Sequence, residues 1–439
     1  MTDYVLEHAW VDGELRSEVA VSVQGGRFTS VGGPPRSDAR RLTGLTVPGL
    51  ANCHSHAFHR ALRGRTHHGG GTFWTWREQM YRLAERLDPD SYRALAVAVF
   101  REMVASGITS VGEFHYLHHR RDGGSYDEPN VMGLALVAAA REAGLRIALL
   151  DTCYLAAGIG RPIEGVQRRF SDGTAEAWQE RADELTGDAA GDVVVGAAIH
   201  SVRAVPLDQM RLVAEWADRF ETPLHVHLSE QAAENEECLA SYGRTPTEVL
   251  AEAGALSDRT SAVHATHLTD LDVTRLGSSN VTACFCPTTE RDLGDGVGPS
   301  RALLEAGCPV TLGSDSHAVI DLFEEMKALE MDQRSVHETR GHWGAAELLR
   351  AATGDGHASL GFPDAGRIAV GQRADLVTLD LATPRTAGAG ASAETVAFAA
   401  TSADVVHVVS GGRVVHRAGD SAEVGAQLDK VVRGLWEGM

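Results

Sequence analysis

His54 and His56 are the residues in this sequence whose type and spacing most directly suggest chemistry. They follow the apolar run Leu45–Leu50, which predicts a short buried strand that ends near them. Side chains two residues apart on a strand point to the same face, so both imidazoles can reach one point. Neutral imidazole is the commonest metal ligand, and the pair is therefore a candidate metal site. Surface histidines often show the same spacing, so the decision depends on residues farther along the chain.

Polar residues that can bind metals or move protons also follow other apolar runs of the chain. These residues are Glu113–Tyr116, His200–Arg203, His225–Glu230, His264–His267 and Gly313–His317. In a barrel of parallel strands, the C-terminal ends of the strands meet at one face, where enzymes of that fold carry their chemistry. Core strands normally end in neutral turn residues, so scattered structural histidines do not explain the pattern. We expect these residues to gather around one site.

The middle of the chain has the rhythm of a (β/α)8 barrel, which is an α/β fold. Apolar, strand-like runs alternate with helical patterns, as in parallel strands whose two faces are both covered. The predicted strands are Val47–His54, Thr109–His115, Arg146–Tyr154, Asp192–His200, Pro223–Leu228, Thr260–His267, Val281–Pro287 and Pro309–Asp315. The predicted helices include Ser91–Ala105, Val131–Ala143, Ala175–Leu185, Leu207–Phe220 and Thr245–Ala253.

The two ends of the chain predict a second, smaller unit. Residues 4–47 alternate apolar and polar side chains between glycine turns, as short antiparallel strands do. We expect residues 1–47 and 366–439 to form one β-sandwich with a C-terminal helix, and residues 48–365 to form the TIM-like barrel. The strands expected in the C-terminal part are 366–371, 374–380, 405–409 and 412–416.

The composition argues against several classes of partner. The 439 residues carry 60 acidic and 40 basic side chains, a net charge of −20, so we expect neither nucleic acid nor an anionic membrane as a partner. No apolar stretch of about 18 residues predicts a membrane span, and no signal peptide is expected. The scattered cysteines are expected to be reduced thiols in a cytoplasmic protein. We expect a homodimer that acts on a small molecule.

The strand-end residues resemble the pattern of the amidohydrolase superfamily, its metal-dependent deaminases in particular. Several local motifs are also similar to the formimidoylglutamate deiminases of that branch. This resemblance implies hydrolysis of N-formimino-L-glutamate to N-formyl-L-glutamate and ammonia, a step of histidine degradation. His59 departs from the family pattern, in which glutamine commonly occupies that position. The similar segments are His54–Phe58, Phe73–Glu78, Gly112–Tyr116 and Val263–His267.

Within this resemblance, the residue types favour one divalent metal ion. We expect His54, His56, His227 and Asp315 as its ligands, a set of three imidazoles and a carboxylate that suits zinc first and iron second. No lysine stands at a predicted strand end, where a bridge between two metals would need one. The metal would lower the pKa of a water molecule, so that hydroxide forms near neutral pH.

Three residues are expected to move protons or to orient the water. Asp315 would receive the proton of the water, and His264 would hold the water by a hydrogen bond. Glu230 lies three residues beyond His227 and would protonate the departing amine. This trio argues against a metal-bearing binding protein without activity, because binding alone does not need a proton shuttle.

Substrate contacts are expected from residues near the same strand ends. Arg77 and Arg203 are the candidates for the two carboxylates of a glutamate-derived ligand, since a guanidinium pairs with both oxygens of a carboxylate. Tyr116 and His200 would hydrogen-bond the formimino or amide portion, and His59 is a further candidate. An ordinary surface ion pair is the alternative for either arginine. A larger apolar pocket without paired arginines would instead favour a deaminase of ring amines, such as guanine-type or adenosine-type substrates.

Other histidines are expected to lie outside the site. His225 shares a strand face with His227 but lies deeper, so we expect it to be packed inside the barrel. His267 is expected beside the ligands rather than among them. The neighbours His115, His118 and His119 carry no assignment, and His67 and His68 are expected to be solvated in a loop.

Overall fold

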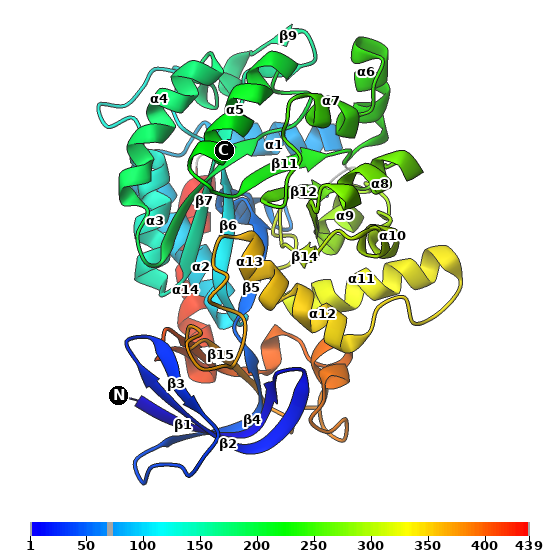
Figure 1. Cartoon of the computed structure of the whole chain (residues 1–439). Coiled ribbons are helices and arrows are strands. Elements are labelled where there is room, and N and C mark those ends of the chain that lie inside the picture. The colour runs from blue at the N-terminus through cyan, green and yellow to red at the C-terminus, as the bar shows by residue number, and fades with distance from the viewer. Residues whose placement is uncertain (1, 68–72, 438–439) are drawn as a thin grey trace.

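The computed structural model describes residues 2–67 and 73–437, and its largest sheet is the predicted barrel (Figure 1). Eight parallel strands follow one another around this sheet in the order in which they occur in the chain. All eight predicted strands are confirmed, with small shifts of their ends. They are β5 (Leu50–Ser55), β6 (Ile108–His115), β7 (Arg146–Cys153), β10 (Val193–Ile199), β11 (Leu224–Leu228), β12 (Thr260–His264), β13 (Thr282–Phe285) and β14 (Val310–Leu312).

The barrel closes between its first and last strands at the point where three predicted ligands lie. Ser55 and Asp315 form an isolated parallel bridge just beyond the end of β14. The carbonyl of His54 accepts from the amides of Ser314 and Asp315 at 3.1 and 3.0 Å, and the amide of His56 donates to the carbonyl of Asp315 at 3.2 Å. The backbone that closes the barrel therefore also sets the distance between ligands that are far apart in sequence.

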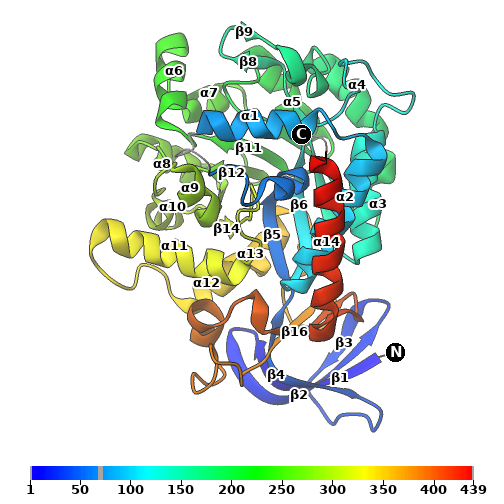
Figure 2. The same cartoon turned by 180° about the vertical axis from the view of Figure 1, so that it is seen from behind.

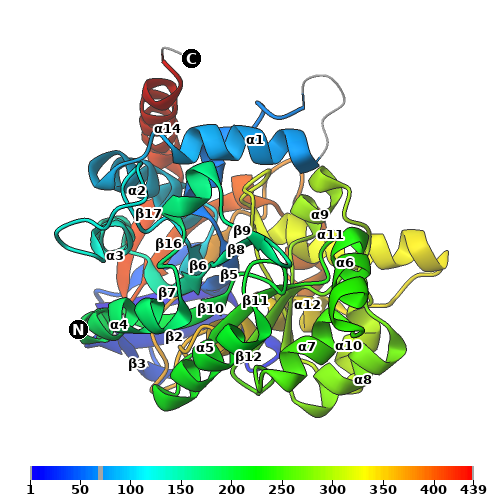
Figure 3. The ribbon, with the colours of Figure 1, turned by 90° about the horizontal axis from the view of Figure 1, so that it is seen from above.

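Helices surround these strands when the molecule is seen from above (Figure 3). The five predicted helices are confirmed to within a few residues. Capping supports them locally: Asp88 accepts from the Ser91 amide at the start of α2, and Thr245 accepts from the Glu248 amide at the start of α7. The helices are α1 (Phe73–Ala84), α2 (Pro89–Ala105), α3 (Val131–Ala143), α4 (Ala175–Leu185), α5 (Leu207–Arg219), α6 (Ala232–Tyr242), α7 (Pro246–Glu252), α8 (Asp270–Ser278), α9 (Pro287–Leu293), α10 (Ser300–Ala306), α11 (Leu322–His337), α12 (Ala345–Ala351), α13 (Gly354–Ser359) and α14 (Ser421–Trp436).

The two ends of the chain form a separate seven-stranded sheet, as predicted, below the barrel in Figure 1. Side chains from both ends, such as Phe28 and Leu376, share one hydrophobic cluster on it. The final helix, α14, leaves this sheet and packs against α2 on the outside of the barrel (Figure 2). In sheet order the strands are β17 (Arg413–Arg417), β16 (Val405–Ser410), β15 (Leu376–Leu379), β4 (Arg40–Pro48), β1 (Thr2–Val11), β2 (Glu14–Gln24) and β3 (Arg27–Val31).

Two details of the predicted strands need correction. The strand predicted over 366–371 is wrong, because Gly366 and Gly371 turn the chain with φ of 80° and 87°. The strand predicted over 47–54 is divided at Gly49, where β4 ends and β5 begins. A Cβ atom at Gly49 would lie 2.3 Å from Thr109 Oγ1, so only glycine lets the two sheets approach this closely. The domain boundaries at 47/48 and 365/366 stay a prediction.

Two shorter features bear on the site. A small hairpin of β8 (Ala156–Gly158) and β9 (Arg161–Pro162) lies above the barrel, and a 3-10 helix over Ala57–Leu62 follows β5 and carries His59. Among the residues that the structure describes, no helix is long and apolar enough to cross a membrane. The terminal sheet covers the lower end of the barrel, which leaves the C-terminal ends of its strands for the site (Figure 1).

Candidate active site

All four predicted metal ligands converge at the top of the barrel. The Nε2 atom of His54 lies 3.0 Å from Nε2 of His227 and 3.2 Å from Oδ1 of Asp315. The Nε2 atom of His56 lies 3.3 Å from the same Asp315 oxygen. All four side chains are buried, and their ligand atoms lie within 4.8 Å of one another. Strands β5 and β11 and the turn after β14 thus bring three imidazoles and one carboxylate to one point.

The protonation of these histidines fits a cation at that point. Nδ1 of His56 donates to the carbonyl of Phe114 at 3.0 Å, and Nδ1 of His227 donates to the carbonyl of His200 at 2.9 Å. Their Nε2 atoms therefore present lone pairs toward the centre of the group. Burial lowers the pKa of His54 to about 4, so this ring is neutral at pH 7. Converging lone pairs repel one another unless a cation lies between them, and zinc or iron(II) suits this donor set.

Removal of one ligand should therefore remove the metal. We expect purified protein to hold about one divalent metal per chain, and His227→Ala to lower its affinity by more than the roughly 10–100-fold that loss of a supporting group costs. His225→Ala is the matched control, because His225 lies on the same strand and is also buried. Elemental analysis of both variants is the measurement. Full metal occupancy in His227→Ala would remove this histidine from the site.

Glu113 supports the ligand segment from the neighbouring strand. Its carboxylate accepts from the Ser55 hydroxyl and from the Ala57 amide, both at 2.6 Å. The Ser55 oxygen also lies 3.0 Å from Nε2 of His317. Burial raises the pKa of Glu113 to about 8. This carboxyl group therefore contacts the residues on both sides of His56.

The two other predicted proton carriers lie beside the ligands. Glu230 follows β11, and His264 ends β12, with 4.0 Å between Nε2 of His264 and the nearer Glu230 oxygen. Glu290 was not predicted as a site residue. Its carboxylate lies 3.3 Å from Nδ1 of His264 and accepts from the Cys286 amide at 2.9 Å. Burial alone would lower the pKa of His264, but Glu290 and the nearby carboxylates outweigh it and raise this pKa to about 10. The ring is therefore a hydrogen-bond donor on the side that faces the site.

Strained backbone is concentrated in the same turns. Ser229, His264, Asp315 and His317 all have positive φ angles, of 51°, 70°, 38° and 59°. Each such residue costs roughly 1–3 kcal/mol and persists only where the surroundings hold it. The strand ends at this site are thus held in strained conformations that direct their side chains to the site. This strain lowers the free energy of unfolding.

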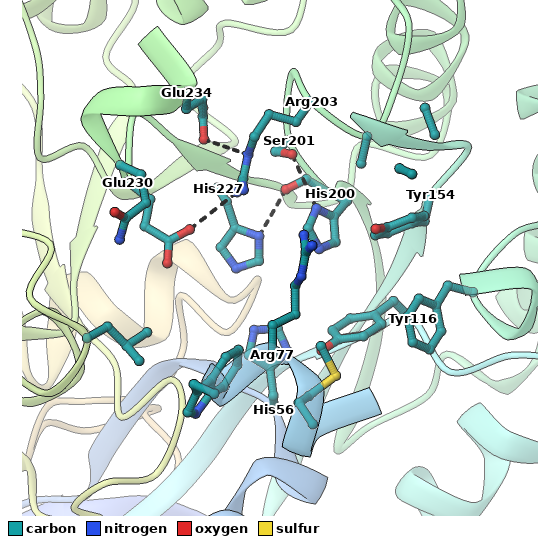
Figure 4. A pocket seen from close by; sticks show the side chains of 18 of the residues that line it. His56, Arg77, Tyr116, Tyr154, His200, Ser201, Arg203, His227, Glu230 and Glu234 are labelled. Atoms are coloured by element: carbon teal, nitrogen blue, oxygen red, sulfur yellow. Dashed lines mark hydrogen bonds and ion pairs between the residues drawn. The ribbon is translucent and has the colours of Figure 1, made fainter. Parts of the chain in front are cut away.

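The cavity next to the ligands has a volume of about 390 Å³ and is open on one side. Every predicted substrate residue lines it, and Figure 4 shows most of them together with Glu230 and His227. Aromatic and apolar side chains that were not predicted complete the wall, among them Trp76, Met80, Tyr81, Tyr154 and Phe170. The predicted substrate-binding residues that line the cavity are His59, Arg77, Tyr116, His200 and Arg203.

The two predicted arginines reach the pocket from different elements. Arg77 comes from α1, and its guanidinium lies 5.6 Å from the centre of the Tyr81 ring. Arg203 follows β10, and its side chain is 20% exposed. It forms ion pairs with Glu234 at 3.0 Å and with Glu230 at 3.4 Å. A third arginine, Arg161 of β9, also lines the pocket and was not predicted.

His225, His267, His115 and His118 lie outside the ligand group of His54, His56, His227 and Asp315. His225 is buried within the barrel, and Nε2 of His267 donates to the carbonyl of Asp295 at 2.8 Å. His115 and His118 approach Asp151, but that carboxylate is already bound by Arg181 and Trp178 in a buried ion-pair network. His68 lies outside the described residues.

Comparisons with known proteins agree with this architecture. Formimidoylglutamate deiminase of Pseudomonas aeruginosa is 39% identical over 88% of this chain and 87% of its own. A 5-methylthioadenosine/S-adenosylhomocysteine deaminase of Natronomonas pharaonis is 29% identical over 84% of this chain and 81% of its own. The crystal structure of an amidohydrolase from Brucella melitensis matches 99% of this chain and 100% of its own, with a TM-score of 0.90 and 30% identity. The model of the amidohydrolase family matches residues 45–415, and the chain belongs to that family.

Proposed function

We propose that this protein is a metal-dependent deiminase that hydrolyses N-formimino-L-glutamate to N-formyl-L-glutamate and ammonia. The observation that carries this proposal is that Arg77 and Arg203 line the same cavity as His56, His227 and Asp315, three members of the expected ligand group. A substrate with two carboxylates and one amidine needs such a combination. The similarity to the Pseudomonas aeruginosa deiminase supports the same choice.

His54, His56, His227 and Asp315 would hold the metal, with zinc as our first choice and iron as the second. When bound, this metal would lower the pKa of a water molecule, so that hydroxide is available near neutral pH. His264 would hold the attacking water by a hydrogen bond, and Asp315 would accept its proton. Attack on the formimino carbon gives a tetrahedral centre with two nitrogens and one oxygen. Glu230 would protonate the nitrogen that leaves as ammonia.

The other pocket residues would orient the substrate. Arg77 and Arg203 would pair with its two carboxylates. Tyr116 and His200 would contact the formimino portion. His59, which stands where the family commonly has glutamine, lies 2.8 Å from the Tyr116 hydroxyl through its Nε2 atom. Burial holds the pKa of His59 well below its usual range, so we infer that its neutral ring orients Tyr116 by a hydrogen bond.

Release of ammonia from N-formimino-L-glutamate by the purified, metal-loaded protein tests the proposal. Adenosine-type and guanine-type ring amines should be assayed beside it, because the aromatic wall of Tyr81, Tyr154 and Phe170 would also suit a planar ring. A kcat/KM that is higher for a ring amine than for N-formimino-L-glutamate would favour the second candidate function, a deaminase of ring amines.

Arg203→Met should weaken the glutamate-type substrate far more than it affects metal content. Loss of a charge-assisted carboxylate contact costs on the order of 2–5 kcal/mol when the partner charge is left buried. Steady-state kinetics would show this as a lower kcat/KM. Arg219→Met is the matched control, since Arg219 forms an exposed ion pair with Asp183. If kcat/KM for Arg203→Met stays within a factor of two of the wild type, this arginine is structural.

A further inference from the structure

Arg203 is held in the pocket by a carboxylate that takes no part in the proposed mechanism. Oε2 of Glu234, in the first turn of α6, lies 3.0 Å from Nε of Arg203, and the Glu234 side chain is fully buried (Figure 4). The contact is an ion pair without hydrogen-bond geometry, and neither atom has a hydrogen-bond partner in the described chain. An unpaired buried charge is costly, so each of the two side chains depends on the other.

The second oxygen of Glu234 holds the backbone next to the proposed proton shuttle. Oε1 accepts from the amide of Ser229 at 3.0 Å, and this contact is buried. Ser229 has a positive φ of 51° and directly precedes Glu230. One carboxylate therefore contacts both the arginine expected to bind substrate and the strained turn that presents Glu230.

The charge of Arg203 agrees with this geometry. Burial would lower the pKa of Arg203, but Glu234 and then Glu230 outweigh it, so the guanidinium stays charged. Glu234 forms its ion pair with Nε of Arg203 at 3.0 Å, and Glu230 contacts a terminal nitrogen of Arg203 at 3.4 Å. Arg203 lines the cavity, where a planar guanidinium can pair with both oxygens of a carboxylate.

We propose that Glu234 is a positioning residue. It aims Arg203 at a substrate carboxylate and, through the Ser229 amide, fixes the backbone directly before Glu230. This inference rests on the proposed function, because it requires a substrate that carries a carboxylate. Glu234 does not touch the reacting atoms. A buried ion pair with a purely structural role, such as Arg181 with Asp151, lies apart from the cavity lining, whereas Glu234 and Arg203 both belong to it.

The test is the kinetics of Glu234→Gln with N-formimino-L-glutamate. Glutamine keeps the size and can still accept from Ser229, but it cannot form the ion pair. We expect KM to rise about tenfold, within the range for partners in one ion-pair network, with a smaller change in kcat and unchanged metal content. Glu234→Asp keeps the charge and should restore part of the loss. Glu236→Gln, on the same helix but exposed, is the matched control for charge and should behave as the wild type.

A double-mutant cycle with Arg203→Met separates positioning from a general loss of stability. If Glu234 acts through Arg203, the Glu234→Gln change should have little further effect on KM in the Arg203→Met background. Additive effects of the two changes, or a KM of Glu234→Gln within twofold of the wild type, would overturn the inference and leave the proposed function intact. Wild-type protein that releases no ammonia from N-formimino-L-glutamate would overturn both.

Discussion

Turnover of N-formimino-L-glutamate by the Glu230→Gln variant is expected to fall by roughly 10²–10⁴, with metal content unchanged. Glutamine keeps the size of the side chain and some of its hydrogen bonding, but it cannot carry a proton to the departing nitrogen. Glu230 lies 4.0 Å from Nε2 of His264 and lines the cavity, so it is placed to reach the substrate without binding the metal. Single-turnover ammonia release and elemental analysis of the same preparation are the measurements.

Glu237→Gln provides the matched control for this experiment. Its carboxylate also lines the cavity, but it pairs with Arg161 at 3.2 Å and is partly exposed, so its loss should change turnover little. Loss of metal in Glu230→Gln would mean that Glu230 is a ligand. Near-normal turnover would instead assign the proton transfer to Asp315 and His264 alone.

The barrel was predictable because buried, strand-like runs alternate with helical patterns along the middle of the chain. No residue of β6 or β7 is exposed, and such runs need helices on one face and a packed interior on the other. Once the strands are aligned, their C-terminal ends must meet, so the sequence could predict the group of His54, His56, His227 and Asp315. The ends of strands shift by a few residues because neighbouring turns, such as the one at Gly49, decide where pairing stops.

The supporting residues were harder to predict, since they do not lie at strand ends. Glu234 and Glu290 lie in the first turns of α6 and α9, and their contacts with Arg203 and His264 depend on how those helices are docked. The sequence contained one indication of Glu290, because this residue follows the predicted strand that ends at Pro287. Arg161 comes from a short hairpin whose position over the pocket has no periodic pattern in the sequence.

Asp315→Asn should cause the largest loss of activity, because it removes a proposed ligand and a proton acceptor together. Burial would raise the pKa of Asp315, but its contacts with His54 and His56 outweigh burial and hold this pKa well below the usual range. The carboxylate therefore keeps its negative charge near neutral pH, and a neutral amide cannot replace that charge toward a divalent cation. We expect metal affinity to fall by more than about 100-fold and activity in the isolated variant to be lost.

Zinc titration separates the two roles of Asp315. At saturating zinc the variant should regain metal, yet its turnover should stay roughly 10²–10⁴ below the wild type, because asparagine cannot accept the proton of the attacking water. Asp321→Asn is the matched control, since Asp321 is also buried but caps α11 through the amides of Phe323 and Glu324, which asparagine can still do. Recovery of full turnover at saturating zinc would leave Asp315 as a ligand only. The proton would then have to pass to another group, such as Glu230, which lines the same cavity.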